Sequence, residues 1–156
     1  MNPVKHIMVA TDGSELSLKA AAFAGELARA LGASVSVVMV LDDRSVVPQA
    51  WGAVGFPGSG EAEPQSTEDV RRFIEEKALG EEVARTTAAV GELDTAAREV
   101  VVWGHEANQV CDYAESNDVD MIVLGSHGRT GIKRAILGSV SHSVVNQAPC
   151  AVTIVR

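Results

Sequence analysis

The chain is organised around one stretch, Leu124-Gly-Ser-His-Gly-Arg-Thr-Gly-Ile-Lys-Arg-Ala-Ile-Leu-Gly-Ser-Val-Ser141. The apolar run 121–124 predicts a buried strand, and a helical pattern begins at Ser139. The loop between them contains Gly125, Gly128, Gly131 and Gly138. Glycine lets a ligand approach bare backbone, and the first N–H groups of a helix favour an anion. The stretch therefore predicts a phosphate-binding loop between a strand and a helix.

The charge distribution favours the same interpretation. No Asp or Glu occurs in residues 121–156, although the whole chain holds 21 acidic residues. Arg129, Lys133 and Arg134 lie inside the loop, which suits an anion, although a plain turn with solvated cations is the alternative. The loop contains neither a Walker A sequence nor a Gly-x-Gly-x-x-Gly pattern, so it does not predict a kinase-type or GTPase-type mechanism.

Length and composition limit the class of protein. A chain of 156 residues with 46% hydrophobic residues predicts one domain, residues 1–156, with a core of its own. It has no run long enough to span a membrane and no signal-peptide pattern, so we expect a cytoplasmic protein. The net charge of −8 argues against nucleic acid and anionic membranes as partners. Cys111 and Cys150 are expected to be small buried hydrophobic residues, since no metal or redox motif accompanies them.

Apolar periodicity predicts five strands that alternate with four helices. The strands are expected at 5–10, 33–41, 97–103, 119–124 and 150–155. The helices are expected at 14–31, 68–90 (weakened by Gly80), from about 106 onward, and 139–147. This alternation is typical of an α/β fold with a doubly wound parallel sheet and helices on both faces. Residues 43–67, rich in Pro and Gly, predict an irregular connection in which Trp51 and Phe56 pack against the surface.

Asp12 follows the first predicted strand and has two interpretations. It is a candidate N-cap of the first helix, supported by Glu15 three residues later. It also lies at the carboxyl end of a strand, where open α/β sheets bind ligands, and the two roles are compatible. His105, Glu106 and Asp112 show no metal-ligand spacing, so we expect them to be surface residues and predict no protein metal site.

The pattern Gly125-x2-Gly128-x9-Gly138-Ser139 resembles the nucleotide-binding signature of the universal stress protein family, in its ATP-binding branch. The runs 7–14, 120–125 and 148–155 are similar to the family as well, so the resemblance covers the chain except roughly 43–67. It implies a Rossmann-like, adenine nucleotide alpha hydrolase-like sheet of strand order 3-2-1-4-5. That order would place Asp12 and the glycine loop at one crevice.

The resemblance also implies a ligand and its contacts. ATP would lie across the strand ends, with its adenine near the backbone of Val40 and of 10–12, and Mg²⁺ would be held through the phosphates. The glycines would allow close approach, Ser139 and Ser141 would offer hydroxyls, and Arg129 would supply charge. The residues implied as nucleotide-binding are Ala10, Thr11, Asp12, Val40, Leu124, Gly125, His127, Gly128, Arg129, Gly138, Ser139, Val140 and Ser141.

These expectations predict a nucleotide-dependent regulatory switch in the stress response rather than an enzyme. At most slow ATP hydrolysis is expected, because Asp12 is the only carboxylate expected near the loop and no Walker lysine or obvious base accompanies it. The alternatives are a slow ATPase or self-phosphorylating enzyme, a sensor of AMP or another adenylate, and an interaction module with an empty site. The resemblance further implies a homodimer through the apolar edge 151–155, and the regulatory partner protein is not predicted.

Overall fold

The computed structural model describes residues 3–44, 66–128 and 137–156, so most of the predicted connection 43–67, with Trp51 and Phe56, lies outside it. The strands are β1 (His6–Thr11), β2 (Ser34–Leu41), β3 (Arg98–Trp103), β4 (Met121–Gly125) and β5 (Ala151–Val155). The helices are α1 (Glu15–Leu31), α3 (Thr67–Ala78), the π-helical turn η1 (Leu79–Val83), α4 (Ala84–Val90), α5 (Glu106–Ser116) and α6 (Ser139–Gln147). All strand pairs are parallel in the order β3-β2-β1-β4-β5, which confirms the predicted fold class and order.

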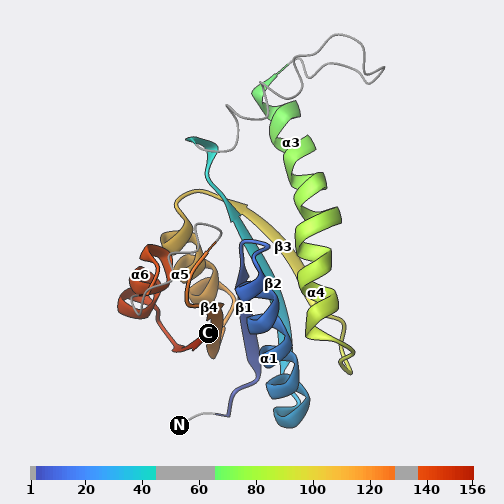
Figure 1. Cartoon of the computed structure of the whole chain (residues 1–156), viewed down its shortest axis with the longest axis vertical. Coiled ribbons are helices and arrows are strands. Elements are labelled where there is room, and N and C mark those ends of the chain that lie inside the picture. The colour runs from blue at the N-terminus through green and yellow to red at the C-terminus, as the bar shows by residue number, and fades with distance from the viewer. Residues whose placement is uncertain (1–2, 45–65, 129–136) are drawn as a thin grey trace.

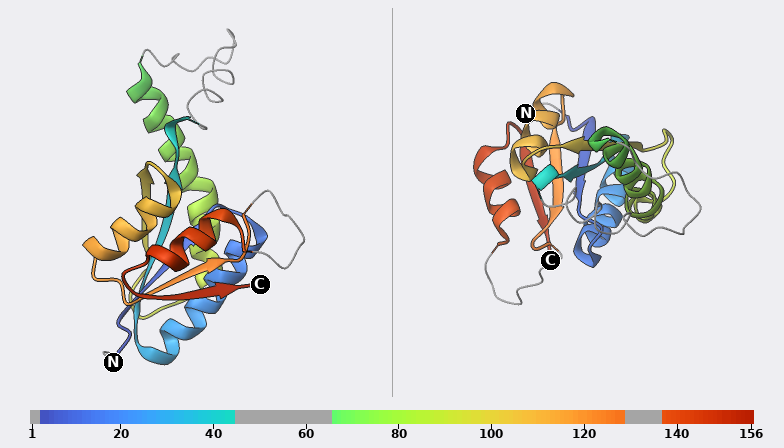
Figure 2. Two further views of the ribbon diagram at one scale, coloured as in Figure 1. Left: turned by 90° about the vertical axis from the view of Figure 1, so that its left-hand side faces the viewer. Right: turned by 90° about the horizontal axis from the view of Figure 1, so that it is seen from above.

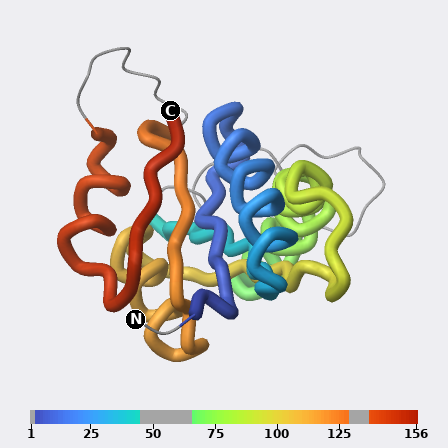
Figure 3. Tube along the Cα trace, turned by 90° about the horizontal axis from the view of Figure 1, so that it is seen from below, coloured from blue at the N-terminus to red at the C-terminus, as the bar shows by residue number. Residues whose placement is uncertain are grey.

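Helices cover both faces of the sheet. Figures 1 and 2 show α1 and the column formed by α3 and α4 on one side, and α5 and α6 on the other. The view from below in Figure 3 shows β1, β4 and β5 side by side between these two layers. None of the described helices combines the length and the apolar character that a membrane span requires.

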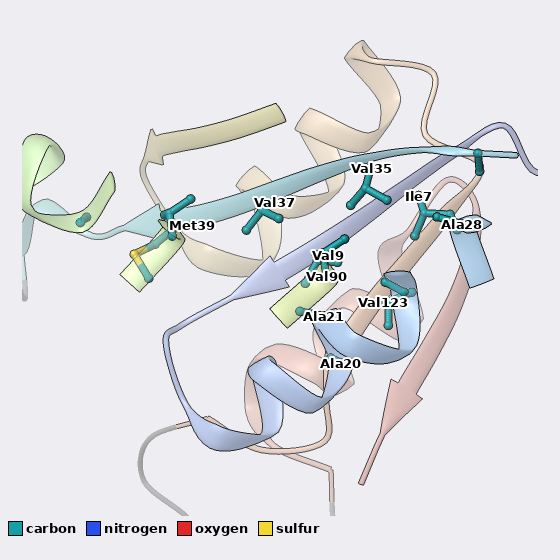
Figure 4. Close-up of a cluster of buried hydrophobic side chains, with 14 of the residues drawn as sticks. Ile7, Val9, Ala20, Ala21, Ala28, Val35, Val37, Met39, Val90 and Val123 are labelled. Atoms are coloured by element: carbon teal, nitrogen blue, oxygen red, sulfur yellow. The ribbon is translucent and has the colours of Figure 1, made fainter. Parts of the chain in front are cut away.

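Alternate strand residues build two separate cores. One core, drawn in Figure 4, packs Ile7, Val9 and Val37 against the alanine face of α1 and against α4. The other packs their strand neighbours, such as Met8 and Val38, against α5 and α6. Buried strands of this kind are covered on both faces, as expected of a parallel sheet.

The first helix begins two residues later than it would if Asp12 were its N-cap. Ser14 is the N-cap of α1, and its hydroxyl accepts a hydrogen bond from the Ser17 N–H at 3.3 Å. The Asp12 carboxylate instead accepts from the Ser14 N–H at 3.0 Å, so it closes the turn before the helix. The cap prediction for Asp12 was therefore wrong, because Gly13, at φ 76°, extends the turn by two residues.

The predicted helix 68–90 exists as α3, η1 and α4, with one wide turn inside it. The first two buried residues, Val70 and Ala78, are eight positions apart, which fits a regular α-helix. The next buried residue, Val83, follows Ala78 by five positions, whereas a regular α-helix would bury a residue after four. A π turn accommodates one extra residue in this way. Gly80 lies within that turn, where the helix was expected to be weakest.

The two cysteines are less buried than predicted. Cys111 and Cys150 are both half-buried, and partial burial raises the pKa of both thiols above the ordinary value. A raised pKa disfavours the thiolate form, which is the nucleophile. The expectation of unreactive side chains is thus supported, whereas the expectation of full burial is not.

Two glycines in the helices should respond oppositely to the same substitution. A Cβ on Gly25 would lie 1.9 Å from the Val90 carbonyl oxygen, so Gly25→Ala forces α1 and α4 apart. We expect a loss of about 3 kcal/mol in the free energy of unfolding. A Cβ on Gly80 meets nothing within 4 Å, so Gly80→Ala should be neutral or stabilising by up to about 1 kcal/mol. Urea unfolding measures both, and equal midpoints for the two variants would contradict this account of α1–α4 packing.

Candidate functional site

The order in which the chain adds strands to the sheet changes direction between β1 and β4. From β1 the chain adds β2 and then β3 on one side, and β4 and then β5 follow on the other side. The helix after β1 covers one face of the sheet and the helix after β4 covers the other (Figure 1). In open α/β sheets the ligand crevice lies at such a point, outside the carboxyl ends of the two strands, and we call this position the crevice. Asp12 and Gly128 meet there, since a Cβ on Gly128 would lie 2.7 Å from Asp12 Oδ2. The structure thus brings together two segments that are far apart in the sequence.

The first turn of α6 is fixed directly to the end of β4. Gly138 is the N-cap of α6, and its N–H donates to the Ser126 carbonyl oxygen at 2.8 Å. A Cβ at this position would lie 3.3 Å from that oxygen and 3.4 Å from the His127 Cα, so close approach rather than a positive φ favours glycine. Glycine has no side chain with which to cap the helix, and the first N–H groups of α6 have no acceptor within the helix. The site therefore presents backbone donors at the positive end of a helix dipole.

The turn after β4 is anchored on three sides. A Cβ on Gly125 would lie 2.9 Å from Leu16 Cβ, so glycine allows α1 to pack here. The Ser126 N–H donates to the Val155 carbonyl oxygen at 2.8 Å, and its hydroxyl lies 3.0 Å from His127 Nδ1. His127 Nε2 is buried and lacks a hydrogen-bond partner within the described part of the chain. A buried imidazole nitrogen of this kind is available to a bound polar group.

The two candidate hydroxyls of α6 differ in availability. Ser141 is buried, and its hydroxyl donates to the Gly125 carbonyl oxygen at 2.8 Å. Its single proton is thus already used within the fold, which is contrary to the expectation that it donates to phosphate. Ser139 is exposed at the first position of the helix, and Val140 is half-buried against the core under α5 and α6. Arg129 lies outside the described residues.

The predicted nucleotide-binding residues in β1, β2 and β4 do not all lie on the same face of the sheet. Ala10, Val40 and Leu124 all pack against the core under α5 and α6. The Thr11 side chain is buried on the opposite face, where its hydroxyl contacts Ser17 and Thr86. Thr11 therefore offers a ligand its backbone only.

Two carboxylates that the sequence analysis did not assign to the site lie near Asp12. Partial burial, and then the charges of Asp12 and Asp42, raise the pKa of Glu106 above its ordinary value, and His105 partly offsets them. Asp42 is paired with Arg44, whose hydrogen bonds lower the pKa of Asp42. These acids extend the carboxylate side of the site away from Asp12, and the expectation that Asp12 is the only carboxylate near the glycine loop stays a prediction.

A sequence signal for these acids existed. Asp42 follows the last residue of β2 and Glu106 begins the helix after β3, so both lie at carboxyl ends of strands. The order β3-β2-β1 places the end of β2 next to the end of β1, where Asp12 lies, and the end of β3 one strand further along the same edge. Within 3–44, 66–128 and 137–156, no three or more His, Cys, Asp or Glu side chains are arranged to hold a metal ion.

Comparison with known proteins gives one consistent family. The sequence profile of the universal stress protein family matches residues 3–156. The chain is 33% identical over 156 residues to a universal stress protein of Methanocaldococcus jannaschii, covering 99% of this chain and 84% of the relative. It is 32% identical over 152 residues to the protein YxiE of Bacillus subtilis, covering 96% of this chain and 97% of the relative.

Solved structures share the fold. A universal stress protein of Lactobacillus plantarum superposes with a TM-score of 0.73 at 22% identity, over 100% of both chains. A universal stress protein described as a complex with cAMP gives a TM-score of 0.60 at 24% identity, over 99% of this chain and 98% of the other. One from Archaeoglobus fulgidus, described as a complex with dAMP, gives 0.60 at 23% identity, over 99% and 100%.

The pKa of Glu106 should depend on the charge of Asp12. Because the pKa of Glu106 is raised in the folded state, its protonated form stabilises the fold at low pH, and this contribution is lost as pH rises through the folded-state pKa. Asp12→Asn removes one of the repelling charges and should move the pKa of Glu106 down towards its ordinary value. An NMR titration of the Glu106 carboxyl carbon measures this shift. Asp94→Asn, in the exposed turn before β3, is the control and should leave the titration unchanged; equal titrations in all three proteins would refute the cluster.

Proposed function

The chain belongs to the universal stress protein family, and from this premise we propose that it binds an adenine nucleotide in the crevice between β1 and β4. We propose further that it acts as a nucleotide-dependent regulatory switch with little or no hydrolysis. The observation that carries the proposal is the uncapped start of α6, held at the end of β4 by the hydrogen bond from Gly138 to Ser126.

The phosphates would lie at the start of α6. The backbone N–H groups there suit an anion, and the close contacts at Gly138 disfavour a side chain between helix and turn. His127 Nε2 adds a buried nitrogen without a partner among the described residues of the turn. Arg129 would contribute charge, as the sequence predicts.

The nucleoside would lie at the acidic side of the crevice. Glu106 interacts electrostatically with both Asp12 and Asp42, and carboxylates accept hydrogen bonds from ribose hydroxyls or the adenine amino group. The same charges repel phosphates, which favours a single orientation of the ligand. The complexes of relatives with cAMP and dAMP support an adenine nucleotide as the ligand class. ATP with Mg²⁺ held through its phosphates is the specific proposal, and AMP is the alternative.

A slow ATPase is the second candidate, and one observation favours it. Glu106 has a raised pKa in the crevice, and a carboxylate with a raised pKa is better suited to accept a proton from water. Against efficient turnover stands the absence of a Walker A lysine in the sequence. We therefore propose binding as the function and hydrolysis as at most a slow side activity.

The nucleotide proposal predicts a specific loss of binding at Gly138. Gly138→Val places a branched side chain against Ser126 and His127, so it should weaken the binding of ATP or AMP by at least about tenfold. Isothermal titration of protein stripped of bound nucleotide, with and without Mg²⁺, measures the dissociation constant. Mass spectrometry of the small molecules released on denaturation identifies any nucleotide that copurifies.

The control for Gly138→Val is Gly80→Val, the same substitution at a glycine remote from the crevice with open space around it. It should leave nucleotide affinity unchanged. Wild-type protein that releases no adenylate and binds neither ATP nor AMP would eliminate the nucleotide proposal and favour an interaction module.

The edge strand β5 supports a proposed homodimer. β5 is last in the strand order, so one edge of its backbone has no neighbouring strand among the described residues, and its apolar side chains Val152 and Ile154 are only half-buried. Antiparallel pairing of two copies through Ala151–Val155 would satisfy these backbone groups.

Thr153 lies at the centre of β5, so a two-fold pairing would bring its two copies together. We expect Thr153→Lys to shift a wild-type dimer to monomer, whereas Thr95→Lys, in the exposed turn before β3, should not. Sedimentation equilibrium over a range of concentrations measures the mass. A monomer mass for the wild type at every concentration would rule the dimer out.

A further inference from the structure

Two consecutive residues of α4 hold the turn that carries Asp12. This turn, residues 11–14, joins β1 to α1. The Arg85 guanidinium donates a hydrogen bond to the Gly13 carbonyl oxygen, and Thr86 Oγ1 lies 2.9 Å from Thr11 Oγ1. Thr86 is fully buried at 0% exposure, so its hydroxyl contact is shielded from water.

Thr11 Oγ1 is the junction of a buried hydrogen-bond network. Its oxygen accepts from the Gly13 N–H at 3.1 Å, and its single proton can go either to Thr86 Oγ1 at 2.9 Å or to Ser17 Oγ at 3.1 Å, but not to both at once. Ser17 in turn donates to the Ser14 carbonyl oxygen at 2.7 Å. Thr11, Gly13 and Ser14 are thus bonded into this network or to Arg85, and the Asp12 carboxylate accepts a hydrogen bond from the Ser14 N–H. The position of the Asp12 carboxylate therefore depends on contacts made by α4.

The π turn η1 places Thr86 in this network. In a regular α-helix the residue seven positions after Ala78 shares its buried face, and that residue is Arg85. The extra residue of η1 moves the buried phase on by one, so that Val83, Thr86 and Val90 are buried. Arg85 is thereby turned to the exposed flank, from which it reaches Gly13. The hydroxyl of Thr86 also donates to the Glu82 carbonyl oxygen at 2.8 Å, within η1.

Thr87, the residue that follows Thr86 in α4, provides an internal control. Thr87 Oγ1 is buried but has no hydrogen-bond partner among the residues that the structure describes, whereas Thr86 Oγ1 contacts both Thr11 and Glu82. Two adjacent threonines of one helix thus differ in their connection to the crevice. A structural role for any buried threonine would apply to both, whereas a role through Thr11 applies to Thr86 alone.

We propose that Thr86 and Arg85 are positioning residues that fix the β1–α1 turn, and with it Asp12, in the conformation that receives an adenine nucleotide. The proposal rests on the proposed function for the identity of the ligand. A turn held in its bound conformation spares the ligand the entropic cost of ordering it. Because energetic coupling is reciprocal, nucleotide bound at Asp12 should in turn stabilise the junction of η1 and α4.

The first arm of the test uses protein without nucleotide. Hydrogen exchange at the Gly13 and Ser14 N–H groups, followed by NMR, reports whether the turn is held. We expect Thr86→Val to speed this exchange about five- to tenfold, because its methyl group cannot bond Thr11. Thr86→Ser keeps the hydroxyl and should stay near wild type, and Thr87→Val should stay at wild type. Arg85→Met, at an exposed residue that cannot disrupt the core, should speed exchange at the same amides.

The second arm measures the dissociation constant of ATP, with AMP as a second probe. Thr86→Val should weaken binding about tenfold, whereas Thr86→Ser should restore it to within about twofold and Thr87→Val should not change it. In an Asp12→Ala background, Thr86→Val should cause no additional loss, since it acts through Asp12. Measurements are made at a temperature at which every variant is folded.

Each result decides a separate point. Unchanged exchange in both Thr86→Val and Arg85→Met would overturn the clamp on the turn. Faster exchange with unchanged nucleotide affinity, or an equal loss of affinity in Thr87→Val, would overturn the positioning role. A wild type that binds neither ATP nor AMP would remove the positioning role together with the proposed function, and the exchange arm alone would then decide whether α4 clamps the turn.

Discussion

The hydrogen bond from the Gly138 N–H to the Ser126 carbonyl oxygen, at 2.8 Å, is the contact on which the crevice depends. It brings the start of α6 to the end of β4 with no side chain between them, and a Cβ at Gly138 would make contacts of 3.3 and 3.4 Å with the backbone of Ser126 and His127 that are relieved only by a shift of a few tenths of an ångström. Ser141, in the first turn of α6, strengthens the same junction because its hydroxyl donates to the Gly125 carbonyl oxygen. The first N–H groups of α6 are consequently held in one place before any ligand arrives. Backbone donors fixed in this way bind an anion without the cost of ordering flexible side chains.

The two sides of the crevice have opposite electrical character. The α6 side presents backbone donors, and the sequence carries no acid from Met121 to the end of the chain. The other side carries Asp12, Asp42 and Glu106, where partial burial, and then the charges of Asp12 and Asp42, raise the pKa of Glu106. A ligand with an anionic end and a hydrogen-bond-donating end fits this polarity in one orientation only. An adenine nucleotide has both ends, which is why polarity and the family assignment support the same proposal.

The sequence predicts the features that repeat locally and misses those that depend on distant partners. Apolar periodicity located the five strands, and the spacing of Gly125, Gly128 and Gly138 located the glycine loop. The strand order came from the resemblance, since local pattern does not specify which strands pair. The acids at Asp42 and Glu106 were missed because their proximity to Asp12 follows from that order. The partners of hydroxyl groups were also not predictable, since a serine or threonine bonds wherever the fold brings an acceptor.

The π turn changes which residues of α4 are buried. A uniform period over 68–90 assigns Arg85 to the buried face, where an unpaired guanidinium would be costly. Because of one extra residue near Gly80, Thr86 rather than Arg85 occupies the buried face. The Thr86 hydroxyl is small enough to be buried, and it contacts Thr11 and Glu82. A buried hydroxyl network contributes little net stability compared with an apolar core of the same shape. Its benefit is directional, because hydrogen bonds fix the orientation of the turn at Asp12 in a way that methyl groups cannot. A polar network beneath a sheet end is therefore better explained by the geometry it imposes on the crevice than by stability.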